Sequence, residues 1–354
     1  MNKFYRYLLK ATLNANDRED IYDNFRQYLM DGQSIEKSFE KMIINYTRRG
    51  KKPKDEIAFI LSECLENIKQ GYSLGESMKD WLPEQELSVI DACNLAGRPW
   101  DGFKKAIKIA QSTSRLKNSI RGALFTSLYM FSLSFTILCG ACIFLVPMLL
   151  DSVPLVQWSI AQKFVYYFYV FITSYGWLLL VVVTAICYLI YYSFPRWTGN
   201  RRFYADKFVP YSLYKELHGA TFIVNIDSML SSDIPLRESL IKIRDMSDSP
   251  WLIEKINATL SRLADGEENL GSALDTSGYE FPSENAIIKM QSLFETSNQE
   301  GSLTRFADRQ VEITLSTVEK KGNLIKLVSM FSGAAATIAI VGIMYSLIQI
   351  ALNI

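Results

Sequence analysis

The sequence has very little histidine and lacks two motifs that common enzymes depend on. Its 354 residues include a single histidine, His218. A lone histidine without a nearby set of cysteine or carboxylate partners is more often structural than a catalytic base or a metal ligand. No GxxxxGK[ST] segment and no HExxH segment is present, so nucleotide hydrolysis and zinc-dependent hydrolysis lack their usual parts. We therefore expect no catalytic residue, no metal site and no cofactor.

Long parts of the chain also lack charge. Between Arg121 and Arg196 only Asp151 and Lys163 are charged, and no charged residue follows Leu327. The other charged residues lie in two segments, 1–121 and 196–326. Because the net charge is only +1, the sequence has no basic surplus that would indicate a nucleic-acid partner.

Three apolar stretches are long enough to cross a membrane, which takes about 20 residues of helix. They are Ala123–Leu150, a span near 172–192 within the longer run Phe164–Tyr192, and Leu327–Leu352. We expect the first helix to end near Pro147. The Tyr-rich start of the second run is typical of a membrane interface.

The lysines and arginines that flank these stretches predict the orientation. Arg115, Lys117 and Arg121 precede the first stretch, several more follow the second and precede the third, and the short segment 151–171 has only Lys163. Positively charged residues gather on the cytoplasmic side of bacterial inner-membrane proteins. We therefore predict that both charged segments are cytoplasmic and that segment 151–171 and the C-terminus are periplasmic.

Both charged segments read as helical bundles. Apolar residues recur at helical spacing, for example Ile21, Phe25, Tyr28 and Leu29, and the alternating runs typical of strands are missing. We predict an all-α polytopic membrane protein with this order of parts: helical bundle 1–121 (the first body), membrane helix 122–150, periplasmic loop 151–171, membrane helix 172–193, helical bundle 194–326 (the second body) and membrane helix 327–352.

The second body repeats the first. Gly32–Phe39 aligns with Asp233–Leu240, and Gly71–Met78 aligns with Gly266–Leu274. Gly71 and Gly266 each follow a helical run, where a left-handed glycine commonly ends a helix, and we expect Gly102 and Gly301 at tight turns. The residues of the repeat motif that we expect to be structural are Gly71, Leu74, Gly75, Gly102, Pro235, Leu236, Gly266, Leu270, Gly271, Gly301 and Leu303.

Two further features are candidates for contacts. In the third apolar stretch Ala335, Ala339, Gly342 and Ser346 share one helical face, and small side chains let another helix approach closely; generic small-residue content is an equally good interpretation. The basic segment with Arg48, Arg49, Lys51 and Lys52 can meet an acidic protein face or anionic lipid headgroups, or can simply be a solvated loop.

The paired stretches and their order resemble the GspF/PilC family, the platform proteins of type IV pilus and type II secretion machines. The family element (A/S)G-x-(P/S)-L-x-E-(A/S)-L resembles Ser232–Leu240, and G-x-S-L-(S/G)-x-(A/S)-(L/M) resembles Gly71–Met78 and Gly266–Leu274. The Gly-Glu pair of a third element is replaced by Ser297-Asn298. The early start of the first body is similar to the type IVb branch, that of bundle-forming and toxin-coregulated pili.

The resemblance implies a platform in the bacterial inner membrane that is not an enzyme and couples a cytoplasmic assembly ATPase to pilin extraction and pilus polymerisation. The implied partners are that ATPase, other inner-membrane pilus assembly proteins, pilin or pseudopilin, membrane lipid, and a second copy of the chain in a dimer or higher oligomer, with no nucleic acid. The alternatives are a subunit of a membrane permease or channel, and a membrane-anchored adaptor or sensor. The absence of ionisable residues from the predicted spans disfavours a carrier.

Overall fold

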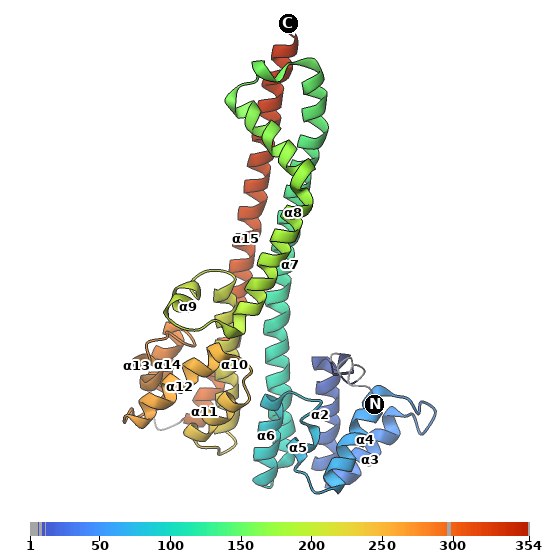
Figure 1. Ribbon diagram of the computed structural model, residues 1–354. Helices are drawn as coiled ribbons and strands as arrows, with labels where there is room; N and C mark the ends of the chain where they lie inside the picture. The colour runs from blue at the N-terminus through green and yellow to red at the C-terminus, as the bar shows by residue number, and fades with distance from the viewer. Residues whose placement is uncertain (1–5, 7–8, 11, 296–298, 353–354) are drawn as a thin grey trace. The chain divides into compact units, whose positions relative to one another are not determined.

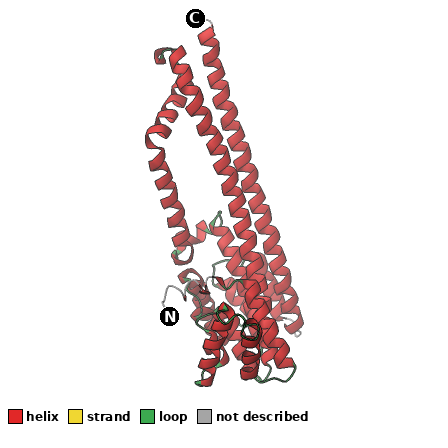
Figure 2. Ribbon diagram, turned by 90° about the vertical axis from the view of Figure 1, so that its right-hand side faces the viewer, coloured by secondary structure: helices red, strands yellow, loops and turns green. Residues whose placement is uncertain are grey.

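The structure, a computed structural model, describes residues 6, 9–10, 12–295 and 299–352. Over these residues the chain consists of helices, turns and loops, with no strand (Figure 2). The predicted all-α class is confirmed. Figure 1 labels most of the helices, whose bounds are α2 (Ala15–Met30), α3 (Ile35–Tyr46), α4 (Glu56–Lys69), α5 (Leu74–Met78), α6 (Glu84–Leu95), α7 (Pro99–Ser152), the short 3₁₀ helix η1 (Leu155–Gln157), α8 (Ile160–Arg196), α9 (Asn200–Ala205), α10 (Tyr211–Leu230), α11 (Leu236–Asp245), α12 (Pro250–Ala264), α13 (Leu270–Thr276), α14 (Glu284–Glu295) and α15 (Gln299–Leu352).

In the first body, polar residues set where the helices begin and aromatic residues fill the core. Asn14 and Ser73 each form a capping box at the start of α2 and α5, which satisfies amide groups that would otherwise lack partners. The rings of Phe25 and Phe103 stack 5.0 Å apart, and Phe39 meets Phe25 edge-on at 4.5 Å. These three side chains are fully buried, and each such burial contributes about 2–3 kcal/mol.

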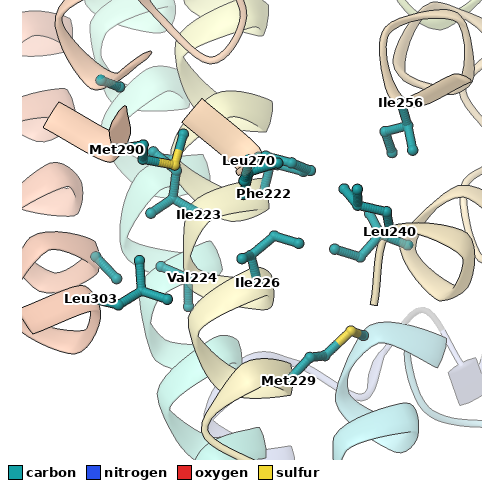
Figure 3. Close-up of a cluster of buried hydrophobic side chains, with 14 of the residues drawn as sticks. Phe222, Ile223, Val224, Ile226, Met229, Leu240, Ile256, Leu270, Met290 and Leu303 are labelled. Carbon is teal, nitrogen blue, oxygen red and sulfur yellow. The ribbon is translucent and has the colours of Figure 1, made fainter. Parts of the chain in front are cut away.

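The second body is built around α10. Every residue from Gly219 to Met229 is buried, and a helix buried on all sides must be enclosed by other helices. Figure 3 shows the α10 residues Phe222, Ile223 and Ile226 facing residues from the surrounding helices. These surrounding residues are Leu240 of α11, Ile256 of α12, Leu270 of α13, Met290 of α14 and Leu303 of α15.

Three helices, α7, α8 and α15, are long and apolar enough to cross a membrane. Two details differ from the sequence-based expectation. Helix α7 runs through Pro147 to Ser152, which is tolerated where neighbouring groups compensate for the lost backbone hydrogen bond. Segment 151–171, predicted as a loop, is helical from Ile160 onward, because its tyrosine-rich residues continue the apolar run of α8.

The chain divides into two compact units. One consists of Met1–Lys117 and Pro195–Leu315, and the other of Asn118–Phe194 and Ser316–Ile354. In the second unit α7 and α15 lie side by side (Figures 1 and 2). A Cβ on Gly322 would lie 2.6 Å from the Cβ of Ala123, and one on Gly333 would lie 2.3 Å from the Cβ of Ser134. In both contacts the partners are 199 residues apart, as are Gly102 and Gly301.

Candidate functional site at the interface between the two bodies

The two charged bodies meet within the first unit, where α6 and α7 contact the end of α10. The ammonium group of Lys105 donates to the carbonyl oxygen of Ser231 at 2.6 Å and to Oγ of Ser232 at 2.8 Å. The last carbonyls of a helix lack intrahelical partners, so a lysine from the other body satisfies one of them. Cys93 of α6 donates its Sγ–H to Oγ of Ser232 at 3.3 Å.

Lys108 lies one turn further along α7, between two carboxylates of the second body. Its Nζ is 3.2 Å from Oδ2 of Asp227 and 2.9 Å from Oδ1 of Asp308. Asp227 is buried and also accepts from Oγ1 of Thr304 at 2.8 Å. Burial lowers the pKa of Lys108, but hydrogen bonds and charges from Asp308 and Asp227 outweigh it, so the pKa is raised. Lys108 therefore remains a cation that neutralises a buried carboxylate.

Two exposed ion pairs flank this centre, Arg98 with Asp233 and Arg115 with Glu312, each at 2.7–2.8 Å. Exposed pairs contribute little, about 0–1 kcal/mol each. The apolar part of the contact is more substantial, because Val89, Cys93, Ile109 and Leu116 of the first body are buried in the same core as the α10 side chains.

The interface thus has an apolar centre, a buried aspartate paired with a half-buried lysine, and a charged rim. It contains no arrangement of nucleophile and base. Among the described residues no group of three or more His, Cys, Asp or Glu is placed to hold a metal ion. The interface can fix the position of one body against the other. Because part of it consists of ion pairs, a change in the charge of these residues would weaken the contact.

The repeat-motif glycines take two structural roles. Gly71 and Gly266 have φ values of 94° and 105°, in the left-handed region that glycine adopts without steric cost. Gly75 and Gly271 instead allow close helix packing. A Cβ on Gly75 would lie 2.1 Å from the carboxylate of Asp91, and a Cβ on Gly271 would lie 2.3 Å from the backbone nitrogen of Gln291. That they are equivalent residues of a repeated motif stays a prediction.

The other motif residues belong to helices. Gly102 and Gly301 lie inside the first turns of α7 and α15, not at the tight turns expected from their neighbours. A Cβ on Gly102 would lie 2.8 Å from Cα of Ile90, so α6 and α7 pack closely there. Leu74, Leu270 and Leu303 are buried, Leu236 is half-buried, and Pro235 is the N-cap of α11. The Ser297-Asn298 pair lies outside the described residues.

Two other predicted contact groups are exposed. Ala335, Ala339, Gly342 and Ser346 are exposed on α15, which contacts α7 through Gly322 and Gly333 instead. Within the second unit, Ser346 accepts from Nε2 of Gln162 at 2.8 Å. The basic residues Arg48, Arg49, Lys51 and Lys52 lie in the exposed loop between α3 and α4.

One pattern was missed in the sequence. Gly71–Gly75 spells GxSxG, the motif that holds a nucleophilic serine at a turn from strand to helix in hydrolases. Here Ser73 lies between the helices α4 and α5 and caps α5, and it donates to Oδ2 of Asp91 at 3.3 Å. The chain's one histidine belongs to the second body. The strand context that the motif requires is absent from the described part of the chain.

A cluster of cations and aromatic rings was also missed. Arg202 of α9 is fully buried and pairs with Asp206 at 2.9 Å, and its guanidinium carbon lies 4.2 Å from the ring centroid of Tyr211. Lys255 lies 4.2 Å from the ring of Trp251, and burial lowers its pKa to about 8. The sequence gives no periodic signal for this cluster, because its members come from three different helices and the turn after α9.

His218 lies beside this cluster, against the rings of Tyr214 and Trp251. Burial lowers its pKa to about 4, and the charges of Lys117 and Arg202 act in the same direction. The imidazole is therefore neutral at pH 7, and its surroundings are those of a packed side chain.

Comparisons with known proteins agree with the helical architecture. Residues 222–347 match the family described as "Type II secretion system (T2SS), protein F". The chain is also 21% identical to the toxin coregulated pilus biosynthesis protein E of Vibrio cholerae serotype O1 over 355 aligned residues, which cover 99% of this chain and 95% of the relative. Together with the three apolar helices, these matches indicate a multi-pass protein of the inner membrane. These matches support the resemblance of this chain to the GspF/PilC family of pilus assembly and type II secretion and, through the toxin coregulated pilus relative, to its type IVb branch.

Proposed function

We propose that this platform protein couples a cytoplasmic assembly ATPase to the extraction of pilin from the membrane and to pilus growth. The observation that carries the proposal is the continuity of α7 and α15. Each is a single helix of 54 residues that begins among charged residues and ends in an apolar stretch. In both cases the part of the helix in the body and the apolar part belong to one continuous helix with no loop between them, which supports transmission of a force from the body to the membrane segment.

The interface between the bodies supports the same proposal. Lys105 and Lys108 attach α7 to α10 and α15, so a force on the first body reaches the second body as well. Since the ATPase is cytoplasmic, the proposal requires both bodies to face the cytoplasm. We propose this orientation, with the C-terminus in the periplasm, and we regard the two bodies as copies of one module, because α10–α15 follow the order of α2–α7.

Reporter fusions test the orientation. A reporter that is active only in the periplasm, fused near residue 260, is expected to be inactive, and the same reporter fused after residue 352 is expected to be active. Activity near residue 260 would reject both the orientation and the coupling proposal.

Co-purification tests the coupling. The tagged full-length chain, solubilised in detergent, is expected to retain the assembly ATPase of its own pilus system. A variant in which exposed residues of the first body are changed should lose the ATPase, and cells carrying that variant should lose pili. Normal piliation in cells that lack the chain would contradict the proposal. The other partners that we propose are pilin or pseudopilin, neighbouring inner-membrane assembly proteins and a second copy of the chain.

A further inference from the structure

Residues 195–206, the joint segment, follow the apolar run of α8 and are attached to the second body. Oγ of Ser249 donates to the carbonyl oxygen of Pro195 at 3.3 Å. The amide of Gly199 donates to Oε1 of Glu254 at 3.1 Å. Ser249 caps α12 and Glu254 lies within that helix, so a single helix of the second body holds the start of the joint segment.

The backbone of the joint segment forms a short connection between two helices. Helix α8 is continuous over Ile160–Arg196, and only residues 197–199 separate it from α9. Gly199 has a φ of 86°, in the left-handed region that glycine adopts without steric cost, and there the chain turns into α9. Because Pro195 and Gly199 are both bound by α12 or its cap, this connection is held on both sides.

Arg202 of α9 attaches the rest of the joint segment. It is fully buried, and its Nε pairs with Oδ1 of Asp206 at 2.9 Å. Its two terminal nitrogens have no hydrogen-bond acceptor among the described residues. Aromatic rings surround the guanidinium instead, with their centroids 5.9, 4.2, 5.7 and 5.7 Å from Cζ; they belong to Trp197, Tyr211, Tyr214 and Trp251.

This surrounding suits a guanidinium in particular. The negative faces of aromatic rings attract a cation, and the attraction is strongest where water is excluded. A guanidinium is more weakly hydrated than an ammonium and stacks flat on such rings. Burial lowers the pKa of Arg202, while the charge of Asp206 acts in the opposite direction, and an arginine side chain remains protonated inside proteins. The rings therefore hold a permanent cation.

The rings that hold Arg202 belong to helices of the second body as well as to the joint segment. Tyr211 and Tyr214 lie on α10, and Trp251 lies on α12. We propose that Arg202 is a positioning residue, which locks the joint segment onto α10 and α12 so that α8 follows the movements of the second body. The consequence for pilus growth rests on the coupling proposed above, whereas the lock itself does not.

Three variants of the full-length chain in detergent separate the lock from general stability. Arg202→Met removes the guanidinium and keeps a long side chain, and Lys255, whose Nζ is 4.0 Å from Asp206, still provides that buried carboxylate with a cation. Arg201→Met removes an exposed cation from the same short helix. Gly271→Ala strains the contact of α13 with α14, which does not include the joint segment.

Hydrogen–deuterium exchange of the joint segment measures the lock. Losing the attraction between a buried cation and its rings changes an opening equilibrium by about tenfold. The joint segment of Arg202→Met should therefore exchange about tenfold faster than that of the wild type, and Arg201→Met and Gly271→Ala should match the wild type. Equal exchange in Arg202→Met and the wild type overturns the proposal. Equally fast exchange in Gly271→Ala also overturns it, because the segment would then report only the stability of the body.

Pilus assembly, compared at equal amounts of chain in the membrane, tests what the lock does. Cells carrying Arg202→Met should lose most of their pili while the variant still co-purifies with the assembly ATPase, and cells carrying Gly271→Ala should keep their pili. Normal piliation with a loosened joint segment overturns the claim that α8 must follow the second body. If the wild-type chain fails to bind the ATPase, the coupling proposal fails, and the exchange measurements still decide whether Arg202 locks the segment.

Discussion

Gly75 and Gly271 lie where a short helix packs directly on the next helix of its body. For Gly271 the obstacle to a larger side chain is backbone, at 2.3 Å from the nitrogen and 2.5 Å from Cα of Gln291. Backbone cannot move aside as the end of a flexible side chain can, so α13 would have to shift away from α14.

Gly271→Ala is therefore expected to destabilise the second body by about 2–3 kcal/mol, because overpacking a close helix contact costs this much. Gly301→Ala is the matched control, since a Cβ there meets no atom within 4 Å and alanine favours helix by about 0.5–1 kcal/mol. Thermal unfolding of the two purified variants measures the difference. A Tm for Gly271→Ala equal to that of the wild type would show that the helices are not in close contact.

We expect His218 to account for a defined part of the loss of folding stability at acid pH. Its pKa is about 4 in the folded protein, below the usual 6.5, so between these values the unfolded chain binds more protons. Its stabilising contribution is therefore complete above pH 6.5 and is lost as the pH falls towards 4.

We expect the wild type to lose about 1–2 kcal/mol more than His218→Phe between pH 7 and pH 4.5. Melting curves of both proteins at the two pH values measure this, and the carboxyl groups that also titrate are common to both. If both proteins lose the same stability, the imidazole is not shielded from water.

At this scale the sequence predicts backbone roles better than contacts. The left-handed positions of Gly71 and Gly266 follow from a glycine after a helical run, which is a local signal. The packing role of Gly102 depends on Ile90 of another helix, and the position of Arg202 against the ring of Tyr211 depends on how α9 and α10 fold together. Neither has a signature in the local spacing of residues.

Among the elements, the contact of α7 with α10 and α15 contains both a pair with a buried carboxylate and an exposed pair. Asp227 is almost fully buried, whereas Arg115 and Glu312 are more than half exposed. Removing the partner of a buried charge is costly, while removing an exposed partner is not.

Lys108→Ala should therefore destabilise the protein by about 3 kcal/mol, and Arg115→Ala by less than about 1 kcal/mol. Adding Asp227→Asn to Lys108→Ala should recover part of the loss, since no buried charge is then left without a partner. Denaturation of the wild type, the single variants Lys108→Ala and Asp227→Asn and the double variant completes a double-mutant cycle, and additive effects would mean that Lys108 and Asp227 do not interact.

Within this chain, α15 contacts α7 through a different face from the one predicted, and the predicted face stays a candidate for contact with another chain. Both the predicted face with Gly342 and the contacting face with Gly322 and Gly333 are rich in small residues, and only the partner helix distinguishes them. Gly333→Leu should separate α7 from α15 and lower the Tm by several degrees, whereas Gly342→Leu should leave it unchanged in detergent. The opposite order of Tm values would assign the contact to the predicted face.

For the whole molecule, the coupling proposal requires the two bodies to act on each other in a controlled way. Cys93 and Ser232 offer a means of testing this, since their side-chain atoms are 3.3 Å apart across the interface. A disulfide needs sulfur atoms about 2.0 Å apart, which a small adjustment provides.

Ser232→Cys is therefore expected to form a disulfide with Cys93 on oxidation and to hold the bodies together. If pilus growth depends on movement between them, piliation should stop in oxidised cells and resume after reduction, while Ser232→Ala should assemble pili under both conditions. Undiminished piliation with complete disulfide formation would mean that the bodies move as one block.

The repeated spacing of 199 residues in the α7–α15 contact has an evolutionary consequence. When each position faces its own counterpart, the two partners are related as they would be across the twofold axis of a homodimer. An ancestor of half the length could have paired with itself in this way. Gene fusion would then have freed each half to change separately. Lys108 of α7, which meets aspartates of α10 and α15, is the kind of asymmetry that a self-paired ancestor could not have evolved on one side alone.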